Sequence, residues 1–199
     1  MNLRILSVMG LALMMTACAA NPVEVVQPLA PVQRGNVEVV DIDVALSESA
    51  AERMVAFDEK AAQTRLNEGL APYQGGAAKP VEEHYETLPF TVMFGYVMED
   101  VLREKGVTGA EKVRVAVDID TLKTANAAMM WLAGDSDQLS GLVTVYDAAD
   151  NQKLSEFYVD TTNNNAGLLG IAMRGSGIRE RLSAEFAAHV ADQLLTEAE

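Results

Sequence analysis

The chain has 199 residues, of which 49% are hydrophobic, enough for one domain with a packed core and some additional segments. Its formal net charge is -14, and the acidic residues are spread along the chain. Such a surface repels phosphate backbones and anionic lipid headgroups, so the composition argues against nucleic-acid binding and against simple electrostatic docking on a membrane.

The first 17 residues have the pattern of a secretory signal peptide. Residues 1–4 carry one positive charge, Arg4, and the following apolar run from Ile5 to Met15 has 11 uncharged residues. A membrane-spanning helix needs about 20 residues to cross a hydrocarbon core of roughly 30 Å, so this run is too short to span. It matches the h-region of a signal peptide.

The only cysteine of the chain, Cys18, follows this run. The stretch Met15-Thr16-Ala17-Cys18 resembles the lipobox of bacterial lipoproteins, in which small residues precede the cysteine that is lipidated and becomes residue one after cleavage. An ordinary signal peptide, with the cysteine near the cleavage site by chance, is the alternative. The resemblance implies a membrane anchor through acyl chains, which contribute about 0.8 kcal/mol per buried CH₂. Ala19, in place of an aspartate, implies the periplasmic side of the outer membrane.

Residues 18–35 contain three prolines, at 22, 28 and 31. Because proline fixes φ and lacks an N–H donor, we predict that this segment is an extended tether. The alternative is that residues 23–26 add a short edge strand to the domain, bounded by the prolines on both sides. With no second cysteine, an exported domain forms no internal disulfide and depends on its core for stability.

Residues 36–199 are predicted to form a single domain that contains several strands. Alternating or β-branched runs predict strands at 37–44, 113–119, 142–146 and 154–161. The last two runs flank a turn-rich sequence at 147–152, which predicts a β-hairpin.

Three segments, at 49–69, 90–106 and 178–194, have the apolar spacing of amphipathic helices. Ser49 and Glu52 have the spacing of a capping box at the start of the first helix. Residues 70–86 contain two prolines and a Gly-Gly pair and predict a surface connection. Residues 121–138 fit either a short helix or an irregular segment.

This order of elements predicts an α+β (or α/β) fold with two to three helices packed on a small, mainly antiparallel sheet. A family resemblance covers roughly residues 107–195 and rests on GDSDQLSGLVTVYDAADNQKLSEFYVDTT and GLLGIAMRGSGIRERLSAEFAAHVADQL. These stretches resemble the carboxy-terminal half of small, uncharacterised periplasmic and outer-membrane lipoproteins. The resemblance implies a fold like those of the periplasmic domain of the curli secretion lipoprotein and the amino-terminal domain of TolB. Asn151-Gln152-Lys153 departs from the Thr-Gly-Lys that those families prefer.

Residues with catalytic or metal-binding chemistry are few. Asp118 and Asp120 lie two apart on one predicted strand and could act as acid and base, but a hydrated outer face explains them better. The same holds for Asp41 and Asp43. Neither histidine has another histidine or a cysteine three or four residues away, and no Gly-x-Ser-x-Gly elbow or P-loop is present. We therefore expect no enzyme activity, no metal and no cofactor.

The stretch 163–182, which leads into the last predicted helix, has three interpretations. It could be a connection that covers the sheet, an exposed apolar surface for a partner or lipid, or an anion site built from backbone amides and arginines. The candidate interaction or ligand surface combines residues of this stretch with one tryptophan from 121–138. Its members are Trp131, Leu168, Leu169, Ile171, Met173, Arg174, Gly175, Gly177 and Arg179.

The anchor and the lack of a catalytic constellation lead to two functional hypotheses. The first is a lipid-anchored envelope protein that binds an envelope protein partner as a structural or adaptor module in outer-membrane or periplasmic assembly. The alternative is a periplasmic lipoprotein that binds a small molecule or a lipid, using residues 163–179 and Trp131.

Overall fold

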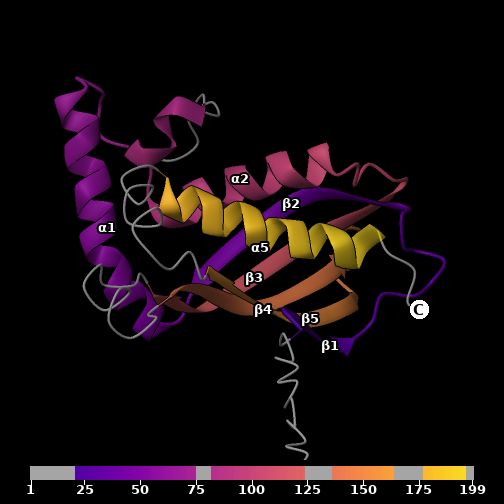
Figure 1. Cartoon of the computed structure of the whole chain (residues 1–199). Helices are drawn as coiled ribbons and strands as arrows, with labels where there is room; N and C mark the ends of the chain where they lie inside the picture. The colour runs from indigo at the N-terminus through magenta and orange to yellow at the C-terminus, as the bar shows by residue number, and fades with distance from the viewer. Residues whose placement is uncertain (1–20, 75–81, 124–135, 164–176, 196–199) are drawn as a thin grey trace, which may run out of the picture.

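The computed structural model describes residues 21–74, 82–123, 136–163 and 177–195. A layer of helices covers one face of a five-stranded sheet (Figure 1). The strands are β1 (Val23–Gln27), β2 (Val37–Leu46), β3 (Glu111–Lys123), β4 (Asp137–Asp147) and β5 (Lys153–Asn163). The helices are α1 (Glu48–Asn67), α2 (Phe90–Glu104), α5 (Ile178–Leu195) and the 3₁₀ helix η1 (Glu82–Thr87).

The sheet has the strand order β1-β5-β4-β3-β2 and is mixed. β1, β5, β4 and β3 are antiparallel neighbours, and β2 pairs with β3 in parallel. The predicted α+β fold with a mainly antiparallel sheet is therefore confirmed. The predicted hairpin is confirmed as well, since β4 and β5 flank a turn in which Asn151 has φ of 59°.

The core lies between the sheet and helices α2 and α5. Along β3, alternate residues from Val113 to Ile119 are at most 1% exposed, as the period-two pattern predicts. From the helical side, the rings of Phe94 and Phe186 meet edge to face with centroids 5.4 Å apart, and both side chains are fully buried. This contact joins α2 to α5 over the valine-rich face of the sheet.

Helix α1 stands at one end of the sheet and packs against β3 and η1 (Figure 1). Its N-cap is Ser47, whose hydroxyl accepts the N–H of Ala50 at 3.3 Å. The prediction that Ser49 begins this helix was wrong by two residues. The N–H of Ser47 donates to the carbonyl of Ile119 at 2.8 Å, so the pairing of β2 with β3 fixes where the helix begins.

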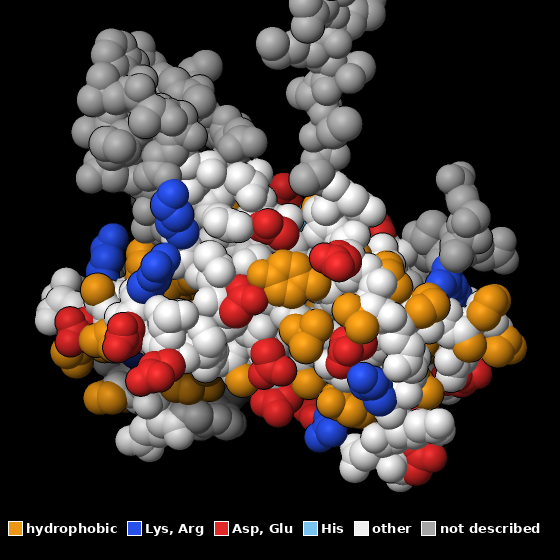
Figure 2. All heavy atoms as spheres, turned by 90° about the horizontal axis from the view of Figure 1, so that it is seen from below, with side chains coloured by type: hydrophobic (Ala, Val, Ile, Leu, Met, Phe, Trp, Pro, Cys, Tyr) orange, Lys and Arg blue, Asp and Glu red, His pale blue; other side chains and the backbone are white. Residues whose placement is uncertain are grey.

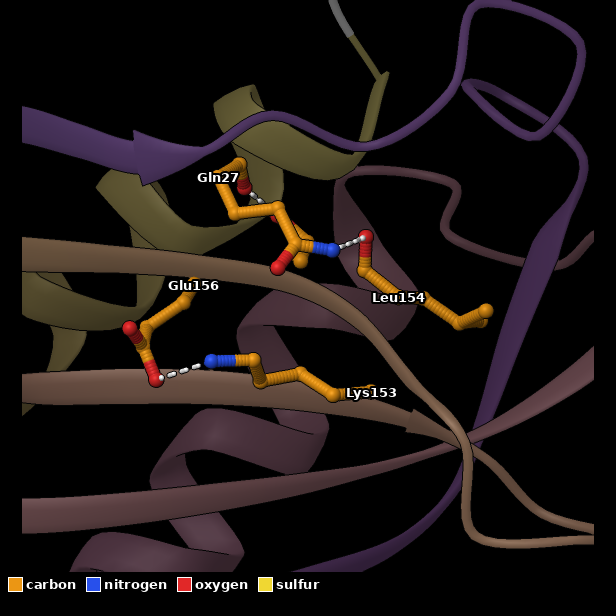
Figure 3. A network of polar contacts seen from close by, with 5 residues as sticks. Gln27, Lys153, Leu154 and Glu156 are labelled. Carbon is orange, nitrogen blue, oxygen red and sulfur yellow. Dashed lines mark hydrogen bonds and ion pairs between the residues drawn. The ribbon is translucent and has the colours of Figure 1, made fainter.

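The predicted tether must be corrected, because the edge-strand alternative is the one found. β1 pairs with β5, and Leu29 beyond it is 3% exposed. The side-chain Nε2 of Gln27 donates to the backbone carbonyl of Leu154 at 3.1 Å (Figure 3), and the hydroxyl of Ser155 donates to the backbone carbonyl of Gln27 at 2.8 Å. The prolines at 22 and 28 flank the strand, so they remove no donor from its interior.

Two connecting segments also differ from their predictions. The surface connection predicted at 70–86 includes η1, where Tyr85 is 6% exposed and its hydroxyl donates to Asp100 Oδ2 at 2.6 Å. An apolar ring at the end of a Pro- and Gly-rich stretch is thus part of the core. In the ambiguous segment 121–138, β3 continues to Lys123 and β4 begins at Asp137. Residues 124–135 lie outside the described residues.

Candidate functional site

Most of the predicted site residues lie outside the described part of the chain. These residues are Cys18, Trp131, Leu168, Leu169, Ile171, Met173, Arg174 and Gly175. The two that are described, Gly177 and Arg179, lie together at the start of α5. Two parts of the described structure carry candidate sites, the face of the sheet opposite α2 and α5 and the cavity next to Arg179.

The face of the sheet opposite α2 and α5, here called the open face, is rich in carboxylates. Figure 2, which views the molecule from the side away from α2, shows acidic side chains gathered around a few hydrophobic ones. By strand register, the acidic residues on this face include Glu24, Asp41, Asp43, Asp118, Asp120, Glu156 and Asp160. This concentration of charge faces solvent because no described helix packs there.

Strand register sets out one row of residues across the open face. Asp118 of β3 is opposite Leu142 of β4, which is opposite Tyr158 of β5, which is opposite Glu24 of β1. Residues opposite one another in antiparallel strands have Cβ atoms about 4.5–5.5 Å apart. The row therefore places an apolar centre between two carboxylates.

Asp120 is held in place beside this row. A register shift between Ile119 and Thr121 makes Asp120 the extra residue of a β-bulge. Its carboxylate accepts hydrogen bonds from the hydroxyl of Ser140 at 3.0 Å and from that of Tyr158 at 2.9 Å. Burial, together with the nearby charge and hydrogen bond of Asp120, raises the pKa of Tyr158, so the phenol stays protonated and continues to donate.

The basic residues of the open face lie at its other end. Arg114 is opposite Tyr146, and its guanidinium lies 5.3 Å from the centre of that ring. Lys153 is opposite Tyr146 on the other side and pairs with Glu156 at 3.0 Å (Figure 3). The part of the face around Asp118, Asp120 and Asp160 consequently has a negative field that these cations offset only from a distance.

The hydrated outer face predicted for Asp118 and Asp120 is confirmed, because both residues are exposed. In the described ranges, no group of three or more His, Cys, Asp and Glu residues is arranged to hold a metal ion. His84 lies in η1 and His189 lies half-buried on α5. The open face thus presents negative charge and hydrogen-bond acceptors to solvent.

A small cavity of about 100 Å³ lies at the start of α5. It is lined by Phe57 and Lys60 of α1, Glu86 of η1, and Arg179 and Glu180 of α5, among others. Arg179 is 8% exposed and lies with its guanidinium 5.9 Å from the centre of the Phe57 ring. Gly177, with φ of 69°, directly precedes the helix.

The described part of the chain also has larger hollows, and two of them lie away from Arg179 and Glu180. A groove of about 490 Å³ runs between β2 and α2, and its wall includes Ile42, Val92 and Tyr96. A second hollow of about 350 Å³ lies beside the carboxyl half of α1 and is lined largely by apolar side chains, Leu66 and Tyr73 among them. Both volumes fall in the range of small-molecule sites.

Several residues of these sites were not found by sequence reasoning. Leu142, Tyr158 and Asp160 alternate outward on the predicted hairpin, which places them on one face but does not assign them to the row with Asp118. Phe57 was invisible as a neighbour of Arg179, since the two lie more than 100 residues apart in the sequence. For the cavity next to Arg179, the local signal in the sequence was the glycine before α5.

Comparison with known proteins gives no match to any family model and none to any curated protein. Solved structures that resemble the chain include the PelC dodecamer from Paraburkholderia phytofirmans, with 10% identity over 88% of this chain and 99% of that one and a TM-score of 0.44. A DUF330-family protein from Xanthomonas campestris is 9% identical over 83% and 85%, with a TM-score of 0.45. A candidate lipoprotein from Caulobacter crescentus is 20% identical over 51% and 80%, with a TM-score of 0.29.

Because all three TM-scores are below 0.5, these likenesses carry no argument about function. The resemblance to the curli secretion lipoprotein and to TolB stays a prediction. Among the described helices, none combines the length and the hydrophobicity needed to cross a bilayer.

Proposed function

We propose that this chain is a lipid-anchored envelope protein that acts as a non-enzymatic adaptor on the periplasmic side of the outer membrane. The lipobox-like sequence before Cys18 supports the anchor. The open face supports the adaptor role, with a protein partner that presents basic side chains.

The observation that carries the adaptor role is the acidic part of the open face. Asp118, Asp120 and Asp160 lie around the half-buried side chains of Leu142 and Tyr158. An apolar centre with a charged surround is the usual arrangement of a protein interface, in which the centre supplies affinity and the charges supply orientation and speed of association. The negative field selects a partner with lysine or arginine side chains.

The position of β1 would keep this surface near the membrane. Val23, the first residue of β1, lies five positions after Cys18 in the chain. A chain reaches at most about 3.6 Å per residue, so an anchor at Cys18 would hold β1 within about 18 Å of its acyl chains. A partner of this protein would therefore meet it close to the lipid surface, as expected for a subunit or neighbour of an envelope complex.

The anchor is tested by replacing Cys18 with serine. We expect C18S to lose incorporation of radiolabelled palmitate and to move from the membrane fraction to the soluble periplasmic fraction. The thioether that carries the lipid cannot form on a serine hydroxyl, and without acyl chains little free energy favours the membrane. Labelling and fractionation that match wild type would refute the anchor.

The adaptor role is tested by photo-crosslinking in cells, with a crosslinking amino acid at position 142 on the open face. We expect an adduct with an envelope protein whose contact region is basic. The double variant D43K/D118K should lose that adduct, because it reverses two charges on the same face.

The matched control places the same charge reversals elsewhere. Glu52 and Glu59 are exposed on α1, so E52K/E59K changes the net charge equally and leaves the open face intact. This variant should keep the adduct at position 142, and a crosslinker at position 59 should give none. An adduct that both double variants lose equally would point to net charge alone and would contradict the proposed docking face.

A second candidate function rests on the apolar hollow beside α1. Its volume of about 350 Å³ and its lining by Leu66, Pro72 and Tyr73 suit the apolar part of a small molecule or lipid. Native mass spectrometry of the full chain should then retain a ligand, and L66E should release it. A wild-type spectrum with the bare protein mass would favour the adaptor alone.

A further inference from the structure

The start of α5 contains a buried positive charge that lacks a full set of partners. Arg179 is more than nine-tenths buried, and its Nη1 atom has no hydrogen-bond partner among the residues that the structure describes. A buried guanidinium normally uses most of its five N–H donors, since an unsatisfied buried donor carries a large desolvation penalty. The arrangement is thus costly unless something else binds there.

Helix geometry adds to this cost. Arg179 lies in the first turn of α5, where the N–H of Arg181 makes an intrahelical bond to the carbonyl of Gly177 at 2.9 Å. The preceding N–H groups in such a turn have no carbonyl within the helix, and the helix end carries about half a positive charge. A cation in the first turn is therefore on the unfavourable end of the helix dipole.

The nearest carboxylate only partly compensates Arg179. Glu180 Oε1 is 3.9 Å from Arg179 Nη2, too far for a hydrogen bond. The other close group is the ring of Phe57, a weaker partner than an anion. The guanidinium borders the cavity of about 100 Å³ described above, so space for a small ligand lies directly beside it.

We propose that this cavity binds a small carboxylate with a single negative charge, held by Arg179, Lys60 and the N–H groups at the start of α5. A planar carboxylate matches the forked donors of a guanidinium. The cavity of about 100 Å³ is well below the range of about 300–1,000 Å³ of drug-sized ligand sites, so it suits a short-chain ligand such as formate or acetate. This site is independent of the proposed docking on the open face.

The charges around the cavity select for a monoanion. Lys60 and Arg179 contribute two positive charges, and Glu86 and Glu180 contribute two negative ones, leaving the positive end of the helix as the net field. A ligand with one negative charge is attracted by this partial positive charge of the helix end, whereas a phosphate dianion would be repelled more strongly by both glutamates. The ligand class is thus a monocarboxylate and not a phosphate ester.

The test measures the thermal stability of the full-length protein in acetate, in inorganic phosphate and in chloride at matched ionic strength. Acetate should raise the Tm in a saturable way beyond chloride, because a ligand that binds only the folded state stabilises it. Phosphate should give less stabilisation than acetate. A larger shift with phosphate, or equal shifts with acetate and chloride, would overturn the proposal.

Variants with opposite expected signs keep the test independent of folding defects. R179Q should weaken acetate binding about tenfold or more, the loss typical of a charged hydrogen bond. K60Q, at an exposed residue, should weaken it about threefold, whereas E180Q should strengthen it about threefold by removing a competing carboxylate. K112Q, an equal charge change at the end of the sheet, should leave it unchanged. If E180Q weakened binding as much as K60Q, or if K112Q matched K60Q, the site would be refuted.

Discussion

The two faces of the sheet differ in what their strands present. Toward α2 and α5, β3 places Val113, Val115, Val117 and Ile119, each at most 1% exposed. On the other side the same strand places Asp118 and Asp120 in solvent. One strand thus contributes to a dry core and to a hydrated acidic surface, because its side chains alternate between two environments. Burial sets the stability of the fold, and exposure leaves the other face free to carry charge.

The largest expected effect comes from neighbouring residues on opposite faces. I119A should lower the free energy of unfolding by about 2–5 kcal/mol, the range for truncating a fully buried aliphatic side chain. D118A, one position away, should change it by at most about 0.5 kcal/mol, as is usual for an exposed residue. Denaturant unfolding of both variants measures the contrast.

That contrast also has a functional side. D118A should weaken the crosslink at position 142, whereas I119A should weaken it only in proportion to the unfolded fraction. A D118A variant that destabilised the protein as much as I119A would mean that the open face is covered by another part of the protein.

The next largest effect on stability is expected from alanine substitutions at two glycines in contrasting surroundings. Gly141 of β4 lies opposite Ile119 next to the bulge, and a Cβ there would be 2.6 Å from the carbonyl oxygen of Asp118. The backbone of β3 cannot move aside easily, so G141A should destabilise the protein by about 1–3 kcal/mol. At Gly95 in α2, such a Cβ would meet no described atom within 4 Å beyond the adjacent backbone of its own helix, and G95A should stabilise the protein by about 0.5–1 kcal/mol. Thermal unfolding of the two variants gives the sign of each stability change. A change of the same sign in both would contradict the close approach of β3 and β4.

The sequence predicted those elements whose signals are local. These signals depend only on residues that are near one another in the sequence. They are the period-two alternation along 113–119, the turn residues after 146 and the helical spacing of apolar residues in 178–194. β1 could not be assigned with the same certainty, because its partner β5 lies more than 120 residues further along the chain. Whether this segment is a tether or a strand depends on the burial of Val23 and Leu29 by residues distant in the sequence, which no local pattern indicates.

The candidate sites show the same division. Asp118 and Asp120 were correctly placed on an outer face by alternation alone. Their neighbours Leu142 and Tyr158 required the register across three strands, and a bulge at Asp120 shifts that register by one residue. Arg179 was singled out through the glycine before its helix, but its burial against Phe57 depends on where α1 packs.

The smallest effect is the pH dependence that Tyr158 adds to the open face. Burial, with the Asp120 hydrogen bond and charge, raises the pKa of this phenol above its ordinary 10.0 in the folded protein. Above about pH 10 the unfolded chain therefore loses this proton first, and the contribution of the protonated phenol to stability is lost as the pH rises through the folded pKa. Y158F has no such proton, so its unfolding free energy should fall less steeply than that of wild type over this range. Urea unfolding at several alkaline pH values measures the two slopes. Parallel slopes would contradict a raised pKa of Tyr158 in the folded protein and with it the hydrogen bond from its hydroxyl to Asp120.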